Sequence, residues 1–221
     1  MLFTPTGLHI REAAEGNNDS RIIEGCAIVF DKETVLWDGK YERIREVIAP
    51  SCVTEEFLAE QDIKLNLLHD RSMSIARCNR GEGTLKLDLR KDGLYFSAEM
   101  PRCDLGDQCL ELVKNGTYTG CSFEFYAKDY KEITVRTEDG RDDTLIRHTA
   151  FESIQALTIA MDPAYNQTSV SVREQARMRE EKRNLEQSEK EAGQAREQEK
   201  QRLYRQRQQT IAQIRRETEL D

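Results

Sequence analysis

The segment 116–125 reads GTYTGCSFEF and places Ser122 after two glycines, at the start of an apolar stretch. A serine hydroxyl becomes a useful nucleophile only when a neighbouring imidazole takes its proton. Cys121 is the competing nucleophile, but adjacent residues of a strand point to opposite faces, so only one of the two can face a base. Because small thiols are commonly buried, we expect Cys121 to face the core and Ser122 the site.

The chain has only three histidines that could serve as the base. His9 lies in an N-terminal segment without pattern. His69 closes the apolar strand IKLNLLHD, and a strand end holds a side chain rigidly while leaving it open to substrate. His148 lies in DTLIRHTAFES, where strand alternation would put it on one face with Ala150 and Glu152. The alternative for His69 is a purely structural role, in which its ring makes ordinary hydrogen bonds at the end of the strand.

Composition narrows the class of protein. The net charge of -8 argues against a general nucleic-acid binder, because acidic surfaces repel phosphate. The six cysteines form no CxxC pair, and no histidine lies at zinc-finger spacing, so we expect free thiols in a reducing cytosol and neither metal nor cofactor. The first residues lack the pattern of a signal peptide, and no apolar run approaches the roughly 20 residues of a membrane helix.

The chain divides into two parts at about residue 170. Residues 20–170 contain short strands separated by turn-forming residues, and in TLKLDLR the three leucines share one face. Helices are expected at residues 51–61 and 105–116. The predicted fold class is therefore mainly β with covering helices (α+β), in a closed or nearly closed sheet. We expect one domain over residues 1–170 and a helical or partly disordered tail over residues 171–221.

The composition of the chain changes after Pro163, toward the tail. The tail is rich in charged residues and glutamine, and Met178, Leu185 and Ala192 keep a seven-residue spacing that predicts a short coiled-coil seam. A charged solvated helix is one interpretation. The other is an assembly arm that pairs with partner helices, including those of other copies. Residues 201–216 contain five arginines and no acid, which leaves nucleic-acid binding by the tail as a further alternative.

The order of several short motifs over residues 22–170 resembles the prohead maturation proteases of HK97-type tailed phages, which are related in fold to the herpesvirus assemblins. In that family a histidine followed by Asp ends a strand, an IGR-like segment follows, a helix leads to a G-x-x-x-G-x-S strand, and a PAN-type turn closes the domain. The matching positions here are His69-Asp70, Ile75-Ala76-Arg77, Gly116 with Gly120 and Ser122, and Pro163-Ala164 with Asn166.

Two positions depart from the family pattern. Ala76 replaces the glycine of the IGR segment, and the glutamate of an E-V-S segment that many members share falls at Ala156. The resemblance to assemblins, which use a second histidine, makes His148 the expected third catalytic residue, with Glu152 as the acidic alternative. A backbone oxyanion site is expected in the sharp turn at Asp162–Tyr165.

The resemblance implies a serine endopeptidase with an assemblin-like barrel, using Ser122 as nucleophile and His69 as general base. Its implied substrates are scaffold and capsid subunits, and itself, inside an assembling procapsid in the host cytoplasm. One alternative is a catalytically inactive assembly protein that keeps the protease fold. Another is a cysteine-dependent hydrolase that uses Cys121.

Overall fold

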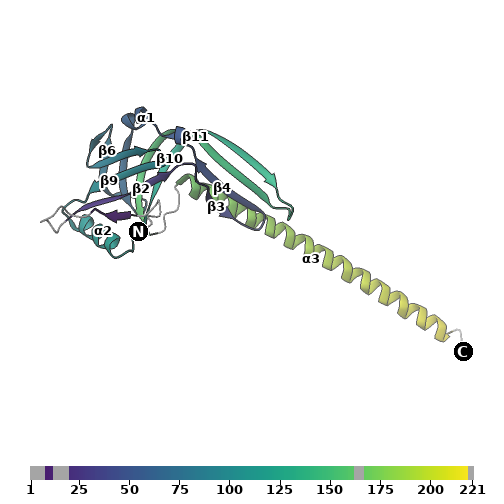
Figure 1. The fold of residues 1–221 in the computed structure, drawn as a ribbon. Helices are drawn as coiled ribbons and strands as arrows, with labels where there is room; N and C mark the ends of the chain where they lie inside the picture. Colours follow the sequence, from purple (N-terminus) through teal and green to yellow (C-terminus); the bar gives the residue numbers. More distant parts are fainter. Residues whose placement is uncertain (1–7, 12–19, 162–166, 219–221) are drawn as a thin grey trace. The chain divides into compact units, whose positions relative to one another are not determined.

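A computed structural model describes residues 8–11, 20–161 and 167–218 of the chain (Figure 1). Eleven strands, three α-helices and one short 3-10 helix follow one another in these ranges. Their bounds are β1 Leu8–Ile10, β2 Ile22–Val29, β3 Thr34–Asp38, β4 Glu42–Ile48, η1 Pro50–Cys52, α1 Glu55–Glu60, β5 Asp62–Leu67, β6 Asp70–Asn79, β7 Glu82–Gly83, β8 Leu85–Arg90, β9 Gly93–Glu99, α2 Asp104–Lys114, β10 Gly120–Arg136, β11 Asp142–Ala160 and α3 Gln167–Thr218.

The larger sheet is built around β11, which is 19 residues long. Its order is β3-β4-β11-β5-β6-β7, and β10 pairs with the other edge of β11. The first part of β11 runs parallel to β4, and residues Ala156–Ile159 run parallel to β5. Because β10 is antiparallel to β11 along its whole length, the Ser122 strand and the β5–β6 hairpin are held on either side of the same strand.

The smaller sheet has the order β1-β2-β9-β8, with antiparallel pairing throughout. Leu85 is fully buried in β8, whereas Lys86 and Asp88 are not, so the predicted alternation of this strand is confirmed. Apolar side chains from both sheets form one core cluster. Its largest fully buried members are Phe123, Ile23, Ile28, Ile63, Leu65, Leu67, Leu85, Leu94, Met100, Ile154, Leu157 and Ile159.

The mixed α+β class is confirmed, but no closed barrel is found among the described strands. Their pairing gives two sheets, each with its own edge strands. The segments 143–151 and 154–161, which the sequence pattern separates, form the single strand β11. Strand β6 is irregular, because three of its residues bulge out between the pairs Leu67↔Asp70 and Asn66↔Ser74 and interrupt the alternation.

Both expected helical regions of the N-terminal part contain helix. The side chain of Thr54 accepts a hydrogen bond from Phe57 N at 3.1 Å and caps α1. Helix α2 buries Cys109, Leu110 and Val113 and ends just before Gly116. Gly116 has φ of 78°, a left-handed conformation that glycine adopts without steric cost, and this turn leads the chain toward β10.

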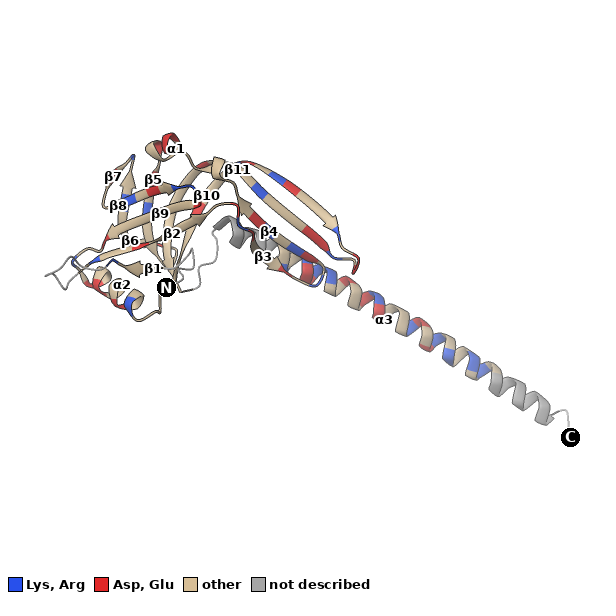
Figure 2. Cartoon of the chain, in the orientation of Figure 1, with Lys and Arg blue, Asp and Glu red and all other residues tan. Residues whose placement is uncertain are grey.

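The contacts between residues divide the chain into two compact units, Met1–Gln175 and Ala176–Asp221. The sequence predicts this boundary after residue 170. The second unit is the main part of α3, on which acidic and basic residues alternate (Figure 2). Pairs such as Arg177–Glu181, at 3.5 Å, lie one turn apart. Met178, Leu185, Leu203 and Tyr204 are exposed.

Among the described helices, none is both long enough and apolar enough to cross a membrane.

Candidate active site

His69 lies in the two-residue turn that joins β5 to β6. Leu68 and His69 have φ of 51° and 61°, as the central residues of a type I′ hairpin turn require. The N–H of Leu68 donates a hydrogen bond of 3.0 Å to the carbonyl of Ile159 in β11. The turn is therefore fixed to the central strand. The His69 side chain remains 35% exposed, so it is both held in place and accessible.

Strand β10 presents Ser122 and Glu124 on one face of the sheet and Cys121 and Phe123 on the other, because successive side chains of a strand alternate. Ser122 lies opposite Thr158, and Glu124 lies opposite Ala156. Ser122 and Glu124 are both 1% exposed. Two residues along a strand span about 6.7 Å, so the hydroxyl and the carboxylate belong to the same small region of this face.

Glu124 connects this strand to the histidine turn. Its Oε1 lies 3.4 Å from Nδ1 of His69, and its Oε2 lies 3.5 Å from a guanidinium nitrogen of Arg71. The hydrogen bond with His69 and the charge of Arg71 lower the pKa of the Glu124 carboxyl, although burial opposes them. Glu124 is therefore a carboxylate at neutral pH.

The charge of Glu124 selects the tautomer of His69. A carboxylate can only accept hydrogen bonds, so Nδ1 of His69 must carry the proton in this contact. The other ring nitrogen, Nε2, is then an acceptor in the neutral imidazole. This is the tautomer in which a histidine can take a proton from a serine hydroxyl.

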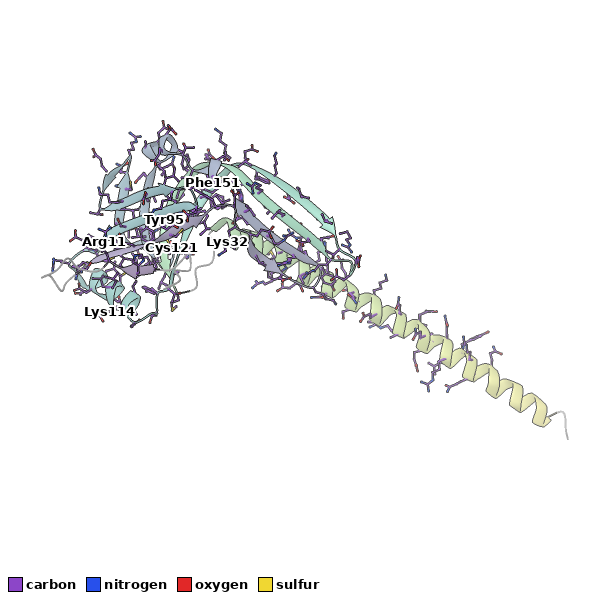
Figure 3. The ribbon with its side chains drawn as sticks, viewed as in Figure 1. Arg11, Lys32, Tyr95, Lys114, Cys121 and Phe151 are labelled. Carbon is purple, nitrogen blue, oxygen red and sulfur yellow. The ribbon has the colours of Figure 1, made fainter. Side chains whose placement is uncertain are left out.

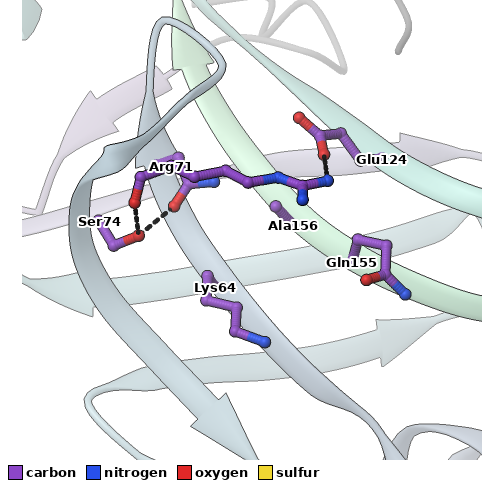
Figure 4. Close-up of a pocket in the computed structure, with 7 residues that line it drawn as sticks. Lys64, Arg71, Ser74, Glu124, Gln155 and Ala156 are labelled. Atoms are coloured by element: carbon purple, nitrogen blue, oxygen red, sulfur yellow. Dashed lines mark hydrogen bonds and ion pairs between the residues drawn. The ribbon is translucent and has the colours of Figure 1, made fainter. Parts of the chain in front are cut away.

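A pocket with a volume of about 200 Å³ lies over this face and is lined by residues of β5, β6, β10 and β11: Lys64, Asn66, Arg71, Ser74, Glu124, Gln155 and Ala156. The Arg71 side chain extends across Ala156 toward Glu124 (Figure 4). Ser74 donates to Asn66 Oδ1 at 2.6 Å, which fixes the base of the bulge that carries Arg71. The pocket is smaller than the roughly 300–1,000 Å³ of small-molecule sites, so it suits a single side chain.

The structure places His148 in a different environment. Its Nε2 is 2.9 Å from Oε1 of Glu46 in β4, and both side chains are buried. Its ring meets Phe125 edge-on, with centroids 5.0 Å apart, on the face of β10 opposite to Glu124. His148 and His69 are therefore not brought together.

Glu152 is not on the face predicted from unbroken alternation either. Register shifts between Ala127 and Asp129 and between Asp129 and Tyr130 interrupt the pairing of β10 with β11, and Glu152 is exposed. The assignment of a third catalytic role to His148 or Glu152 thus has no contact with His69 to support it in the described part of the chain.

Cys121, labelled in Figure 3, is buried in the core cluster. Strand alternation puts it on the same face of β10 as Phe123. Burial raises the pKa of its thiol to about 12. The nucleophilic form of cysteine is the thiolate, which is scarce at neutral pH for such a group. A cysteine-dependent mechanism is therefore disfavoured by both the direction and the ionisation of this side chain.

We expect Cys121→Ala to leave the rate of peptide cleavage within about twofold of the wild type, because the thiol does not face the His69 side of the sheet. The variant should be less stable by about 1 kcal/mol, since a buried sulfur atom is lost. Cleavage assays with the purified variant measure the first effect and urea denaturation measures the second. Loss of cleavage with intact stability would restore the cysteine hypothesis.

Two further segments were expected near the site, Ile75-Ala76-Arg77 and the turn at Asp162–Tyr165, and the structure describes only the first. Ile75 and Ala76 are buried in β6, and Arg77 forms two hydrogen bonds with Asp62, of 2.6 and 2.7 Å. The expected oxyanion turn at Asp162–Tyr165 lies outside the described residues. Within the described ranges, no group of three or more His, Cys, Asp or Glu side chains is arranged to hold a metal ion.

Glu124 is the group in contact with His69 that the sequence interpretation did not single out. The signal was present in CSFEF, because a residue two positions after Ser122 must share its face of the strand. Ala156, where the E-V-S glutamate falls, is the cross-strand neighbour of Glu124. Glu124 therefore brings a carboxylate next to the position of Ala156, from the neighbouring strand.

Comparisons with known proteins identify the family of the chain. The chain matches no curated protein and no solved structure at a significant level. A sequence model of the caudovirus prohead serine protease family matches residues 7–183, which include β1 to β11 and both His69 and Ser122. Since this match covers most of the 221 residues, the chain belongs to the caudovirus prohead serine protease family.

Proposed function

We propose that this protein is a serine endopeptidase that cleaves scaffold or capsid subunits, and itself, during maturation of a tailed-phage or prophage procapsid. Ser122 is the nucleophile and His69 the general base. The observation that carries the proposal is the contact of His69 Nδ1 with Glu124 on the face of β10 that also bears Ser122. That contact leaves Nε2 as the proton acceptor a serine nucleophile needs.

The chemistry proceeds in two steps. In the first, Ser122 Oγ attacks the carbonyl carbon of the peptide bond while its proton passes to Nε2 of His69, and the carbonyl electron pair moves onto oxygen. The C–N bond then breaks as the imidazolium returns the proton to the departing amine. In the second step, His69 takes a proton from water while the water oxygen bonds to the acyl carbon. The bond between this carbon and Ser122 Oγ then breaks and the imidazolium returns its proton to Oγ, which releases the acid and regenerates Ser122.

The proposed setting is the interior of an assembling procapsid in the host cytoplasm, with capsid and scaffold proteins as partners. Enclosing the protease with its substrates in one particle raises their effective concentration, so little intrinsic affinity is needed. The net charge of -8 does not favour binding of the chain to nucleic acid.

Co-expression with the capsid and scaffold proteins of the same genome tests the proposal. We expect the wild type to shorten at least one of these proteins, and itself, in a gel or mass-spectrometric assay. The Ser122→Ala variant should leave all of them at full length. If shortening is the same with both forms, Ser122 is not the nucleophile.

An inactive assembly protein with a protease fold is the second candidate, and the burial of Ser122 favours it. At 1% exposure, its hydroxyl meets a substrate only after neighbouring groups move. A serine-reactive phosphonate probe separates the two candidates. Labelling at Ser122, abolished by Ser122→Ala, indicates an active enzyme, whereas no labelling of the wild type in assembled particles indicates the inactive alternative.

The α3 unit gives a separate prediction. Its side chains are exposed along nearly all of residues 177–208, and such a helix gains most of its stability from partner helices, so we propose self-association or partner binding through it. Deleting residues 176–221 should leave the thermal unfolding of the remaining chain and its cleavage of a short peptide intact while abolishing incorporation into shells. A truncated chain that fails to fold would show that α3 stabilises the strand-rich unit.

A further inference from the structure

The least expected group near His69 is a buried carboxylate. The Glu124 side chain is 2% exposed, yet its two oxygens face one ring nitrogen and one guanidinium. Burying a charge in this way is costly unless other charges or hydrogen bonds offset the cost. An apolar residue would fill the same space at a lower cost in free energy, so the arrangement indicates a role for the charge.

We propose that Glu124 is the positioning residue of the active site, the carboxylate that orients His69 and stabilises its positive charge during acyl transfer. The inference rests on the proposed function for Ser122 and His69. Nothing in the sequence interpretation assigns this residue a role, and it takes the place expected for His148 or Glu152.

The geometry of the imidazole supports this role. The carboxylate meets Nδ1, so the ring presents Nε2 away from Glu124. In a serine–histidine–acid arrangement the acid contacts Nδ1 and the serine contacts Nε2, and the acid stays ionised throughout. The distance of 3.4 Å is long for a charge-assisted hydrogen bond. Catalytic hydrogen bonds are often this long in enzymes without substrate and become shorter in the substrate complex.

Arg71 explains how Glu124 remains ionised. Its guanidinium lies 3.5 Å from Oε2, the carboxylate oxygen that does not face His69, while its side chain is largely exposed. The positive charge favours the carboxylate form and opposes the effect of burial on its pKa. Arg71 therefore acts through Glu124, and we expect its loss to have a smaller effect than the loss of the carboxylate itself.

The chain offers a matched control. Glu46 is also a buried glutamate that contacts a histidine, His148, but this pair lies on the opposite side of β10 from Glu124. Glu46→Gln and Glu124→Gln both replace a buried carboxylate by an amide of the same shape. Any general effect on stability should appear in both variants, and an effect through His69 should appear in Glu124→Gln alone.

We expect Glu124→Gln to lower kcat by on the order of 10⁴-fold with little change in KM, because an amide does not enforce the Nδ1–H tautomer and does not offset the imidazolium charge. Glu46→Gln should leave kcat unchanged. Steady-state peptide cleavage by the wild type and the two variants provides kcat and KM.

A rescue variant uses the strand register. Ala156 is the cross-strand neighbour of Glu124 and lines the same pocket, so a glutamate there can direct its carboxylate toward His69. Glu124→Ala combined with Ala156→Glu should regain kcat by on the order of tenfold or more over Glu124→Ala alone. A merely structural role for Glu124 would not predict such a recovery.

A second measurement does not depend on catalysis. The ¹⁵N chemical shifts of the His69 ring, measured by NMR in the Ser122→Ala background, should show Nδ1 protonated, and Glu124→Gln should populate both neutral tautomers, because an amide can donate as well as accept. If the wild type shows no Ser122-dependent cleavage, the proposed function fails, while this tautomer measurement still decides the role of Glu124. The inference is overturned if Glu124→Gln changes neither the His69 tautomer nor, in an active enzyme, kcat.

Discussion

Replacing Ser122 with alanine is expected to lower the rate of peptide cleavage by about four to six orders of magnitude, and replacing His69 should lower it by a similar factor. In the proposed mechanism the two side chains act as a unit: the hydroxyl is a poor nucleophile without the base, and the base has no proton to take without the hydroxyl. The double variant should therefore be little slower than either single variant.

Steady-state assays with one peptide substrate and the three purified variants measure these rates. Thermal unfolding of each variant serves as the control, since alanine at either position should leave the fold intact. Losses that multiply in the double variant would mean that the two residues act independently, and the proposed pair would then be wrong.

The pH dependence of the wild type follows from the same pair. A histidine base accepts a proton only when it is neutral, so the rate should rise from acidic to neutral pH. Glu124 cannot cause this rise, because its pKa is held below its ordinary value of 4.5. A rate that stays constant over this range would argue against a histidine base.

The second large effect concerns stability. His148→Ala is expected to lower the free energy of unfolding by about 3–5 kcal/mol, because it leaves the Glu46 carboxyl buried without its hydrogen-bond partner. The two side chains are only 5% and 3% exposed, and their contact is 2.9 Å long. The variant also removes an aromatic ring that packs edge-on against Phe125. Urea denaturation of the variant and the wild type measures the loss.

The double variant Glu46→Ala/His148→Ala measures how much of the lost stability comes from the contact between the two side chains. Its loss should be smaller than the sum of the two single losses, since neither group is then left buried without the other. Cleavage by His148→Ala, assayed at a temperature where the variant remains folded, should stay close to that of the wild type. A ten- to a hundredfold loss under these conditions would restore His148 as the partner of His69.

The sequence by itself determined the local features of this protein. The leucine alternation of 85–89 is visible in β8, and the left-handed Gly116 ends the predicted helix α2. The alternation of CSFEF also separated the faces of Cys121 and Ser122, and the chain composition separated α3 from the strands. These features depend on neighbours only a few residues apart, so periodicity and turn-forming residues predict them.

The partners of each strand, in contrast, were decided by the tertiary structure. His69 meets Glu124 across 55 residues of sequence, and His148 meets Glu46 across 102. Both contacts follow from the register of β11 with its neighbours and from bulges that change which side chains share a face. A shift of one residue in pairing exchanges the two faces of a strand, and local periodicity does not specify that register. The sequence therefore singled out Ser122 and His69 as candidates, whereas the carboxylate beside His69 became identifiable only once β5, β10 and β11 were paired.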